Sequence, residues 1–330
     1  MLKKHKPFLS KNNPLNIKQY ECEQFSYKFF LPYYWLTWLG ILLSLILNYL
    51  PHIIRIQLGK LIGRVIYITN KKRRNIAKTN ISLCFKSMSD KDVDNLVRKY
   101  FKNLGRTFID IPILWWRSDK VLKSVCKVKN INYIKNELSK GKGVILLTPH
   151  STSIDFGGRS ISEFPIISMY KPFRNELINW FVGKSRSKST DNVVVYPRTD
   201  FPFKSIIKAL KKPNIFYYIG DEDLGLDNSV FAKFFDEEKS TLIAIRKIVE
   251  LTNCSVLPCI NYFCNDTKEY ITEINKPLVN FPTNDASSDA IIINKCFEQM
   301  INKNLAEYMW SLRIFQTRKQ GTSYPYNDRL

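Results

Sequence analysis

A long stretch without charged side chains lies near the N-terminus of the chain, at residues 29–50. As one continuous helix it would reach about 33 Å, which is enough to cross the hydrocarbon core of a bilayer. Tyr33, Tyr34, Trp35 and Trp38 gather at one end, as aromatic side chains do at a membrane interface. A buried core helix is the alternative, but the length and the basic flanks favour a membrane anchor. We therefore predict a transmembrane or membrane-embedded helix here.

Downstream, the spacing of apolar residues predicts first a helix and then an alternation of strands and helices. Over residues 89–116 apolar side chains recur at three- and four-residue steps, behind Ser89 and Asp90, which can cap a helix. Beyond Gly141, short β-rich runs predict strands at 143–149, 164–170, 192–196, 214–219 and 254–263. Helical patterns cover 175–188, 203–211, 239–251 and 289–307. This alternation predicts an α/β fold, with a mainly parallel sheet flanked by helices on both faces.

The changes of pattern divide the chain into three parts. We expect a basic N-terminal tail at 1–28, a membrane anchor with a juxtamembrane helix at 29–70, and a globular domain at 71–330. Basic residues flank the apolar stretch on both sides, so the positive-inside rule does not orient the N-terminus. The stronger basic cluster at 71–74 places the globular domain in the cytosol, as do seven cysteines without a C-x-x-C pair, which are typical of reduced thiols.

The chain carries a formal net charge of +22, which predicts an anionic partner. Candidates are nucleic acid, an acidic protein, and the phosphates of a lipid or a membrane surface. The alternative is compositional drift, because lysine far outnumbers arginine and both asparagine and isoleucine are plentiful, as a bias in base composition would produce. A nucleic-acid-binding or scaffold protein would leave the apolar stretch and the histidine described next unexplained, so we expect no nucleic-acid partner.

One histidine stands out because it follows a predicted strand. Residues 143–149 end in Pro149, His150 follows at once, and Asp155 comes five positions later. Substrates usually bind at the carboxyl ends of the strands in an open α/β sheet. The chain has three histidines, and the other two lie in the tail and beside the apolar stretch. We interpret His150 as a general base and Asp155 as the carboxylate that orients it and balances its charge.

Ser151 and Ser153 stand beside this histidine and offer a second interpretation, a serine esterase. The chain has no G-x-S-x-G elbow, and it lacks the phosphate-binding G-x-x-x-x-G-K-[ST] and zinc-binding H-E-x-x-H motifs. Direct transfer to a substrate hydroxyl therefore fits better than a covalent enzyme intermediate, although esterase chemistry stays open. Asp221 and Asp223 follow another predicted strand and are pocket candidates; two carboxylates so close could also bind a metal ion.

Several segments of the chain resemble a known enzyme family. The spacing His150-x4-Asp155 behind an apolar strand looks like the H-x4-D/E motif of the glycerolipid and lysophospholipid acyltransferase superfamily. A further series resembles, in order, the bacterial late acyltransferases of lipid A biosynthesis, above all the lauroyltransferase branch: YWLTWLG at 34–40, NISLCF at 80–85, YKP at 170–172, DEDLG at 221–225, SVF at 229–231 and YMW at 308–310. The chain departs from the pattern at Ser151 and Thr152, where the lauroyltransferases usually carry an aromatic residue, and this leaves the acyl-chain preference open.

The resemblance implies an enzyme of the bacterial inner (cytoplasmic) membrane, single-pass or monotopic, with an acyltransferase domain on the cytosolic face. It would move a fatty acyl chain, lauroyl or similar, from acyl carrier protein to a hydroxyl of a Kdo-bearing lipid A precursor, with no cofactor and no metal. The acidic carrier protein, the phosphates and sugar acids of the acceptor, and the inner membrane lipids would all suit a basic protein. An acyltransferase for another glycolipid or a lysophospholipid is the alternative.

The resemblance also gives roles to individual residues. His150 would deprotonate the acceptor hydroxyl, and Asp155 would orient His150 and balance its charge. Arg186 lies where the family has a functional arginine after its Tyr-x-Pro block. It would complete the catalytic set, because the thioester oxygen gains negative charge in the transition state and needs a cationic donor nearby. The candidates for substrate binding are Arg159, Lys171, Arg174, Asp221 and Asp223. A solvated surface position is the alternative for each of the cations.

Overall fold

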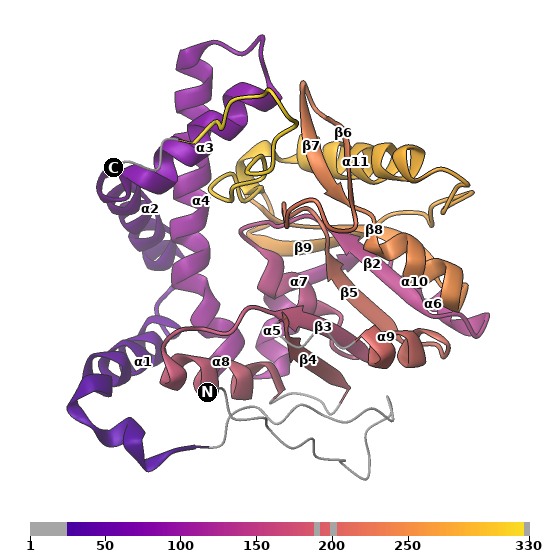
Figure 1. Ribbon diagram of the computed structural model, residues 1–330. Coiled ribbons are helices and arrows are strands. Elements are labelled where there is room, and N and C mark those ends of the chain that lie inside the picture. Colours follow the sequence, from indigo (N-terminus) through magenta and orange to yellow (C-terminus); the bar gives the residue numbers. More distant parts are fainter. Residues whose placement is uncertain (1–24, 188–191, 199–202, 327–330) are drawn as a thin grey trace.

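The computed structural model describes residues 25–187, 192–198 and 203–326, and it shows an α/β fold built on one large sheet (Figure 1). The strands of this sheet are β1 (Cys126–Lys129), β2 (Val144–Thr148), β3 (Ile166–Tyr170), β4 (Val193–Pro197), β5 (Ile215–Ile219), β8 (Ser255–Cys264) and β9 (Glu269–Ile274). Their order is β1-β9-β8-β2-β5-β3-β4, and all neighbours are parallel except β8 and β9. The predicted mainly parallel sheet is confirmed.

Helices cover both faces of this sheet. Side chains alternate along β2, so that Ile145 and Leu147 enter one core cluster and Val144 and Leu146 another. The first cluster is shared with α9 (Phe203–Leu210), α10 (Ala244–Thr252) and α11 (Ala286–Lys303), and the second with α6 (Asn132–Ser139). Every residue of β2 is buried, as expected for a central strand between two helical layers.

The other predicted elements lie close to their expected positions. The five predicted strands correspond to β2, β3, β4, β5 and β8, and three predicted helices correspond to α4 (Asp90–Trp116), α8 (Glu176–Ser187) and α9. The helix predicted at 289–307 is found as α11, followed by the short 3₁₀ helix η4 (Leu305–Glu307). The pattern did not reveal β1 and β9, nor the short helices α5 (Asp119–Val125), α6 and α7 (Ile154–Ser160).

A two-stranded hairpin corrects one prediction. β6 (Ser229–Phe234) pairs antiparallel with β7 (Glu237–Leu242), where the pattern predicted the start of a helix at 239. Helix α10 begins only at Ala244. The buried apolar positions with helical spacing start at Ile245, and the segment before it is held by pairing across the hairpin, as between Lys239 and Ala232. This non-local pairing overrides the local pattern.

The uncharged stretch at 29–50 is not one helix. It contains the end of the short 3₁₀ helix η1 (Tyr27–Phe30) and the whole of the 3₁₀ helix η2 (Pro32–Tyr34) and of α1 (Trp35–Leu47). Helix α2 (His52–Thr69) follows Pro51. Proline lacks a backbone N–H and disfavours a helical residue before it, so Pro32 and Pro51 limit the helix. In the part of the chain that the structure describes, no helix is both long and apolar enough to span a membrane. Most of the expected tail at 1–28 lies outside the described residues.

The boundary expected near residue 71 falls between α2 and α3 (Lys71–Cys84), and α2 packs directly on α4. Gly59 and Gly63 of α2 face Gly105 of α4, where an added Cβ would lie 2.2 Å from the Gly59 carbonyl oxygen. Glycine permits this close approach of two backbones. Arg55 of α2 also reaches α4, with its Nε 3.0 Å from Asp110 Oδ1. Figure 1 shows α1 and α2 on one side of the molecule, with α4 between them and the sheet.

Candidate active site

His150 and Asp221 meet at the carboxyl edge of the sheet. Thr148 at the end of β2 pairs with Ile219 at the end of β5, so the residues that follow these two parallel strands emerge side by side. His150 Nδ1 lies 2.6 Å from Asp221 Oδ1, and the backbone N–H of His150 donates to the same oxygen at 3.0 Å. A carboxylate only accepts hydrogen bonds, so Nδ1 carries the hydrogen and Nε2 of the neutral ring keeps its lone pair.

The surroundings of this pair favour its charged form. Burial opposes a positive charge on His150, but the charge and hydrogen bond of Asp221 outweigh burial and raise the pKa of His150. Burial also opposes the Asp221 carboxylate, but His150 and the buried Lys239 outweigh it and lower the pKa of Asp221. Asp221 therefore stays ionised and stabilises an imidazolium at His150.

A second carboxylate lies near the other ring nitrogen of His150. Its Nε2 is 4.0 Å from Glu222 Oε1, and Glu222 forms an ion pair with Arg198. The sequence pattern did not single out Glu222 or Arg198. A signal was available for Arg198, because the order Tyr-Pro-Arg at 196–198 repeats the order Thr-Pro-His at 148–150 at the end of another strand.

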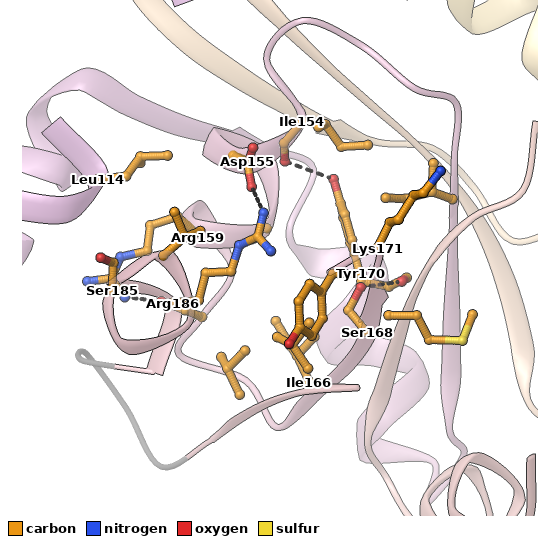
Figure 2. A pocket seen from close by; sticks show the side chains of 18 of the residues that line it. Leu114, Ile154, Asp155, Arg159, Ile166, Ser168, Tyr170, Lys171, Ser185 and Arg186 are labelled. Atoms are coloured by element: carbon orange, nitrogen blue, oxygen red, sulfur yellow. Dashed lines mark hydrogen bonds and ion pairs between the residues drawn. The ribbon is translucent and has the colours of Figure 1, made fainter. Parts of the chain in front are cut away.

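The motif predicts that Asp155 orients His150, but in the structure the carboxylate of Asp155 binds Arg186 instead. Asp155 is the second residue of α7, and its Oδ1 accepts a hydrogen bond from Arg186 Nη2 of α8 at 2.8 Å (Figure 2). The guanidinium carbon of Arg186 also lies 5.8 Å from the centroid of the Tyr170 ring. The structure thus gives the orienting role to Asp221 and makes Asp155 the partner of the predicted catalytic arginine.

A cavity of about 380 Å³ brings His150, Asp155 and Arg186 to one space. Its volume falls in the range of small-molecule sites. Apolar side chains of α4, α8, β3, β4 and β5 form much of its wall. The charged side chains that line it are Asp155, Arg159, Lys171, Arg186, Arg198 and Glu222. The cavity therefore combines apolar walls with a charged region beside His150.

The other predicted substrate residues are placed differently from one another. Arg159 lines the cavity, and its Nη2 donates to Asp119 Oδ1 at the start of α5, at 2.6 Å. Lys171 lines it and is exposed, whereas Arg174 is exposed and is not among the described residues of the lining. Asp223 is buried, and its carboxylate accepts from the backbone N–H and the hydroxyl of Thr317, each at 2.6 Å. Asp223 thus organises the loop and not the cavity.

The two carboxylates considered for a metal ion bind other groups. Asp221 accepts from His150, and Asp223 accepts from Thr317. Within residues 25–187, 192–198 and 203–326, no group of three or more His, Cys, Asp and Glu side chains is placed to hold a metal ion.

Ser151 and Ser153 are not placed as nucleophiles. Both are buried, and neither is among the described residues that line the cavity. Ser153 Oγ donates to Glu307 at 2.9 Å, and Ser151 pairs with Tyr308 in an isolated antiparallel bridge. A serine hydroxyl that is buried in this way cannot reach a substrate in the cavity.

Comparisons with known proteins identify relatives that match most of the chain. The family model described as bacterial lipid A biosynthesis acyltransferase matches residues 22–317. A lipid A biosynthesis acyltransferase of Haemophilus influenzae is 30% identical over 299 residues, which cover 90% of this chain and 92% of the relative. The lipid A biosynthesis lauroyltransferase of Escherichia coli is 29% identical and covers 89% of this chain and 96% of its own length. The palmitoleoyltransferase of the same organism is 28% identical and covers 93% of this chain and 99% of its own length.

Among solved structures, the LPA acyltransferase from Thermotoga maritima covers 77% of this chain and 98% of its own, with a TM-score of 0.36 and 13% identity. This likeness is too loose to bear on the site. The family match spans all the residues of the cavity, and the resemblance seen in the motifs is confirmed. The relatives are named for different acyl chains, so they do not single out a chain length. The chain belongs to the bacterial lipid A biosynthesis acyltransferase family.

Proposed function

We propose that this chain transfers a fatty acyl chain, lauroyl or similar, from acyl carrier protein to a hydroxyl of a Kdo-bearing lipid A precursor. His150 carries the proposal: its Nδ1 is fixed by Asp221, and its ring lines an apolar cavity of about 380 Å³. An imidazole oriented in this way is suited to general-base catalysis. The apolar walls suit the hydrocarbon chain of the acyl donor.

In the proposed reaction one acyl bond replaces another. His150 Nε2 takes the proton of the acceptor hydroxyl while the oxygen attacks the thioester carbonyl carbon and the new C–O bond forms. The intermediate collapses, the C–S bond breaks, and the thiolate of the carrier leaves with the proton from His150. Asp221 stabilises the imidazolium between these steps. No electrons are gained or lost overall, so the reaction requires no redox cofactor.

Arg186 is the proposed donor to the oxyanion. It lines the same cavity as His150, and its hydrogen bond to Asp155 fixes the direction of the guanidinium. A guanidinium carries five N–H donors in a rigid fork, and its charge stays fixed at all working pH values. Asp155 in this proposal acts through Arg186, and the Glu222–Arg198 pair beside Nε2 contacts the acceptor. Arg159 and Lys171 offer positive charge to the phosphates of the acceptor.

The deep end of the cavity is the proposed limit for acyl-chain length. Ile166 at the start of β3 pairs with Val193 at the start of β4. Ile166 and Val144, at the start of β2, both pair with Ile215 of β5, so they lie at the same level of the sheet. At about 3.3 Å per residue, this level is roughly 13 Å from the end of β2. Both Ile166 and Val193 line the cavity, so an acyl chain that enters beside His150 would end against them.

A Val193→Phe variant is therefore expected to prefer shorter acyl chains, because a phenyl ring fills the deep end. Each methylene that no longer fits forfeits about 0.8 kcal/mol of burial, which is roughly fourfold in relative kcat/KM. The products formed from an equimolar mixture of acyl carrier proteins with different chains are measured by mass spectrometry. Val193→Ala is the matched control and should accept the wild-type chain or a longer one. An unchanged product distribution in Val193→Phe would show that the limit lies elsewhere.

The surface of the chain suits the proposed partners. The net charge of +22 attracts the acidic carrier protein, the anionic acceptor and an anionic membrane. Large apolar side chains are exposed along α1 and α2: Trp35, Leu36, Leu39, Leu42, Leu43, Ile46, Ile53, Ile54, Leu61, Val65 and Ile68. The basic cluster at 71–74 directly follows them. We propose that this surface lies against the cytosolic face of the bacterial inner membrane, where the lipid acceptor is found.

A serine esterase and an acyltransferase for another glycolipid or a lysophospholipid are the alternatives. The burial of Ser151 and Ser153 and the bond from Ser153 to Glu307 argue against the esterase. The family match favours a lipid A precursor over other lipid acceptors.

The proposed function is tested with purified protein, acyl carrier protein loaded with a lauroyl chain, and a Kdo-bearing lipid A precursor. We expect a product heavier by one acyl group, and a His150→Ala protein should lose about 10²–10⁴-fold in rate. An esterase would instead release free fatty acid and be labelled on a serine by a fluorophosphonate. The same precursor without Kdo and a lysophospholipid are the matched acceptors. Transfer to the lysophospholipid alone would overturn the proposed acceptor.

A further inference from the structure

The loop that carries His150 lies antiparallel to a segment from far along the chain. The backbone N–H of Thr152 donates to the Glu307 carbonyl at 2.8 Å, and that of Met309 donates to the His150 carbonyl at 3.1 Å. Ser151 and Tyr308 form an isolated bridge between these two bonds. The backbone of the catalytic loop is therefore paired residue by residue with 307–309.

The carboxylate of Glu307 adds side-chain bonds to this backbone pairing. Its side chain is 2% exposed. Oε2 accepts hydrogen bonds from Thr152 Oγ1 and, at 2.9 Å, from Ser153 Oγ. Oε1 accepts from Arg106 Nη2 of α4 at 2.6 Å. One buried carboxylate thus joins α4 to two consecutive hydroxyls of the catalytic loop.

Arg106 supplies the charge that a buried carboxylate needs. Its guanidinium carbon lies 4.0 Å from the centroid of the Phe263 ring, and its Nη1 donates to Asn103 at 3.1 Å. Burial disfavours the charged guanidinium, but Glu307 and Tyr270 together outweigh burial and raise the pKa of Arg106. A buried carboxylate without such a partner would be strongly destabilising. Arg106 and Glu307 therefore persist as an ion pair inside the protein.

We propose that Glu307 is a positioning residue for acyl transfer, which keeps His150 on Asp221 by fixing Thr152 and Ser153, with Arg106 as its counter-charge. This inference rests on the proposed function. It also gives a reason for the hydroxyl side chains of Thr152 and Ser153, which both donate to Glu307. Thr152 is the anchor of the loop on a buried carboxylate.

The position of this loop affects both His150 and Asp155. Ser153 directly precedes α7, so the same anchor sets the start of the helix that carries Asp155. The 2.6 Å bond from His150 to Asp221 tolerates little displacement, and a shift of about 1 Å can cost on the order of 100-fold in rate. Thr152 and Ser153 are not among the described residues that line the cavity, so they act on the reaction through position alone.

The first test removes the Arg106–Glu307 ion pair, here called the clamp, without leaving a buried charge unpaired. In Arg106→Met/Glu307→Met, apolar side chains replace the ion pair, a change that often costs little stability. The ion pair of the partly exposed Arg246 with the buried Asp289, joined at 2.6 Å and outside the described cavity lining, gives the control Arg246→Met/Asp289→Leu. We expect the clamp variant to lose about 10–100-fold in kcat with KM within about twofold, and the control to keep wild-type kcat. Equal kcat in both variants would make Glu307 a purely structural residue.

A second readout does not depend on the reaction. The chain has three histidines, so the NMR signal of His150 can be assigned with a His150→Gln variant and its pKa followed. In the clamp variant the pKa of His150 should fall toward the ordinary value of about 6.5, because the loop no longer holds it on Asp221. In the control it should stay at the wild-type value. An unchanged pKa in the clamp variant would overturn the proposal, whereas absence of transfer by the wild-type protein would refute the proposed function alone.

Thr152→Val tests the same idea with the ion pair in place, and so it serves even if the clamp variant does not fold. It removes one hydrogen bond to Glu307 and keeps the shape of the side chain. We expect kcat about tenfold lower with KM unchanged. In the background of the clamp variant the same substitution should cost nothing further, because its partner is gone. Unchanged kcat in Thr152→Val alone, or an equal loss in both backgrounds, would show that Thr152 does not act through Glu307.

Discussion

An Asp221→Asn variant is expected to lose about 10³–10⁴-fold in kcat, close to the loss caused by removing His150. The amide of asparagine can donate to Nδ1 of His150, which moves the ring hydrogen to Nε2 and removes the base. The variant also lacks the carboxylate that stabilises the imidazolium. The measurement is kcat with saturating acyl carrier protein and acceptor.

Asp223→Asn is the matched control for this experiment. Asp223 leaves the same strand two positions later and is also buried, but it binds Thr317 and not His150. We expect the control to unfold at a lower temperature and to keep its kcat. Similar kcat values for the two asparagine variants would contradict the role of Asp221.

The role of Asp221 also predicts the direction in which the pH profile of the Asp221→Asn protein shifts. His150 must be neutral to take a proton, so kcat/KM falls as pH drops through its pKa. Asp221 raises the pKa of His150, so its removal should move the acid limb of the profile to lower pH while the plateau falls. An acid limb that stays in place, or moves to higher pH, would show that Asp221 does not set the charge of His150.

Replacement of Arg186 by methionine should lower kcat about 10²–10³-fold, because a preorganised donor to the developing oxyanion is lost. Arg186→Lys should recover part of the loss, since it restores the charge without the planar fork. The matched control is Lys184→Met, at an exposed position of the same helix outside the described cavity lining. Kinetics at saturating substrate separate kcat from KM.

Two outcomes would reassign these residues. A rise in KM at constant kcat in Arg186→Met would make Arg186 a substrate-binding residue. Asp155→Asn should also lower kcat, but much less in the Arg186→Met background, because Asp155 holds Arg186. An Asp155→Asn loss of the same size in both backgrounds would show that Asp155 acts on the reaction independently of Arg186.

Local pattern was sufficient for the central part of the fold. The strands β2 and β5 are short apolar runs that end in polar residues, and such runs predict buried parallel strands without further context. The hairpin of β6 and β7 was missed because cross-strand pairing, and not local spacing, determines the conformation of 237–242. The length of the uncharged stretch alone predicts one long helix, whereas Pro32 and Pro51 limit it to shorter elements.

His150 was predictable and its partner was not. A histidine directly after a strand-ending proline is a strong local signal, and nearness in sequence then favoured Asp155. The true partner depends on strand order: β5 lies next to β2 in the sheet although β3 and β4 come between them along the chain. Asp221 therefore reaches His150 from 71 positions away, and Glu307 reaches Thr152 from 155 positions away. No local pattern encodes such distances.

The pairing of the His150 loop with 307–309 also sets the order of events during synthesis. Thr152 precedes its partner Glu307 by 155 positions. At about 5–20 residues per second, a ribosome needs roughly 8–31 s to make that part of the chain. For that interval the nascent chain contains the His150 loop but not the segment that pairs with it. The helices α1 and α2 are made before either segment, so their exposed apolar side chains leave the ribosome before the His150 loop can take its paired conformation.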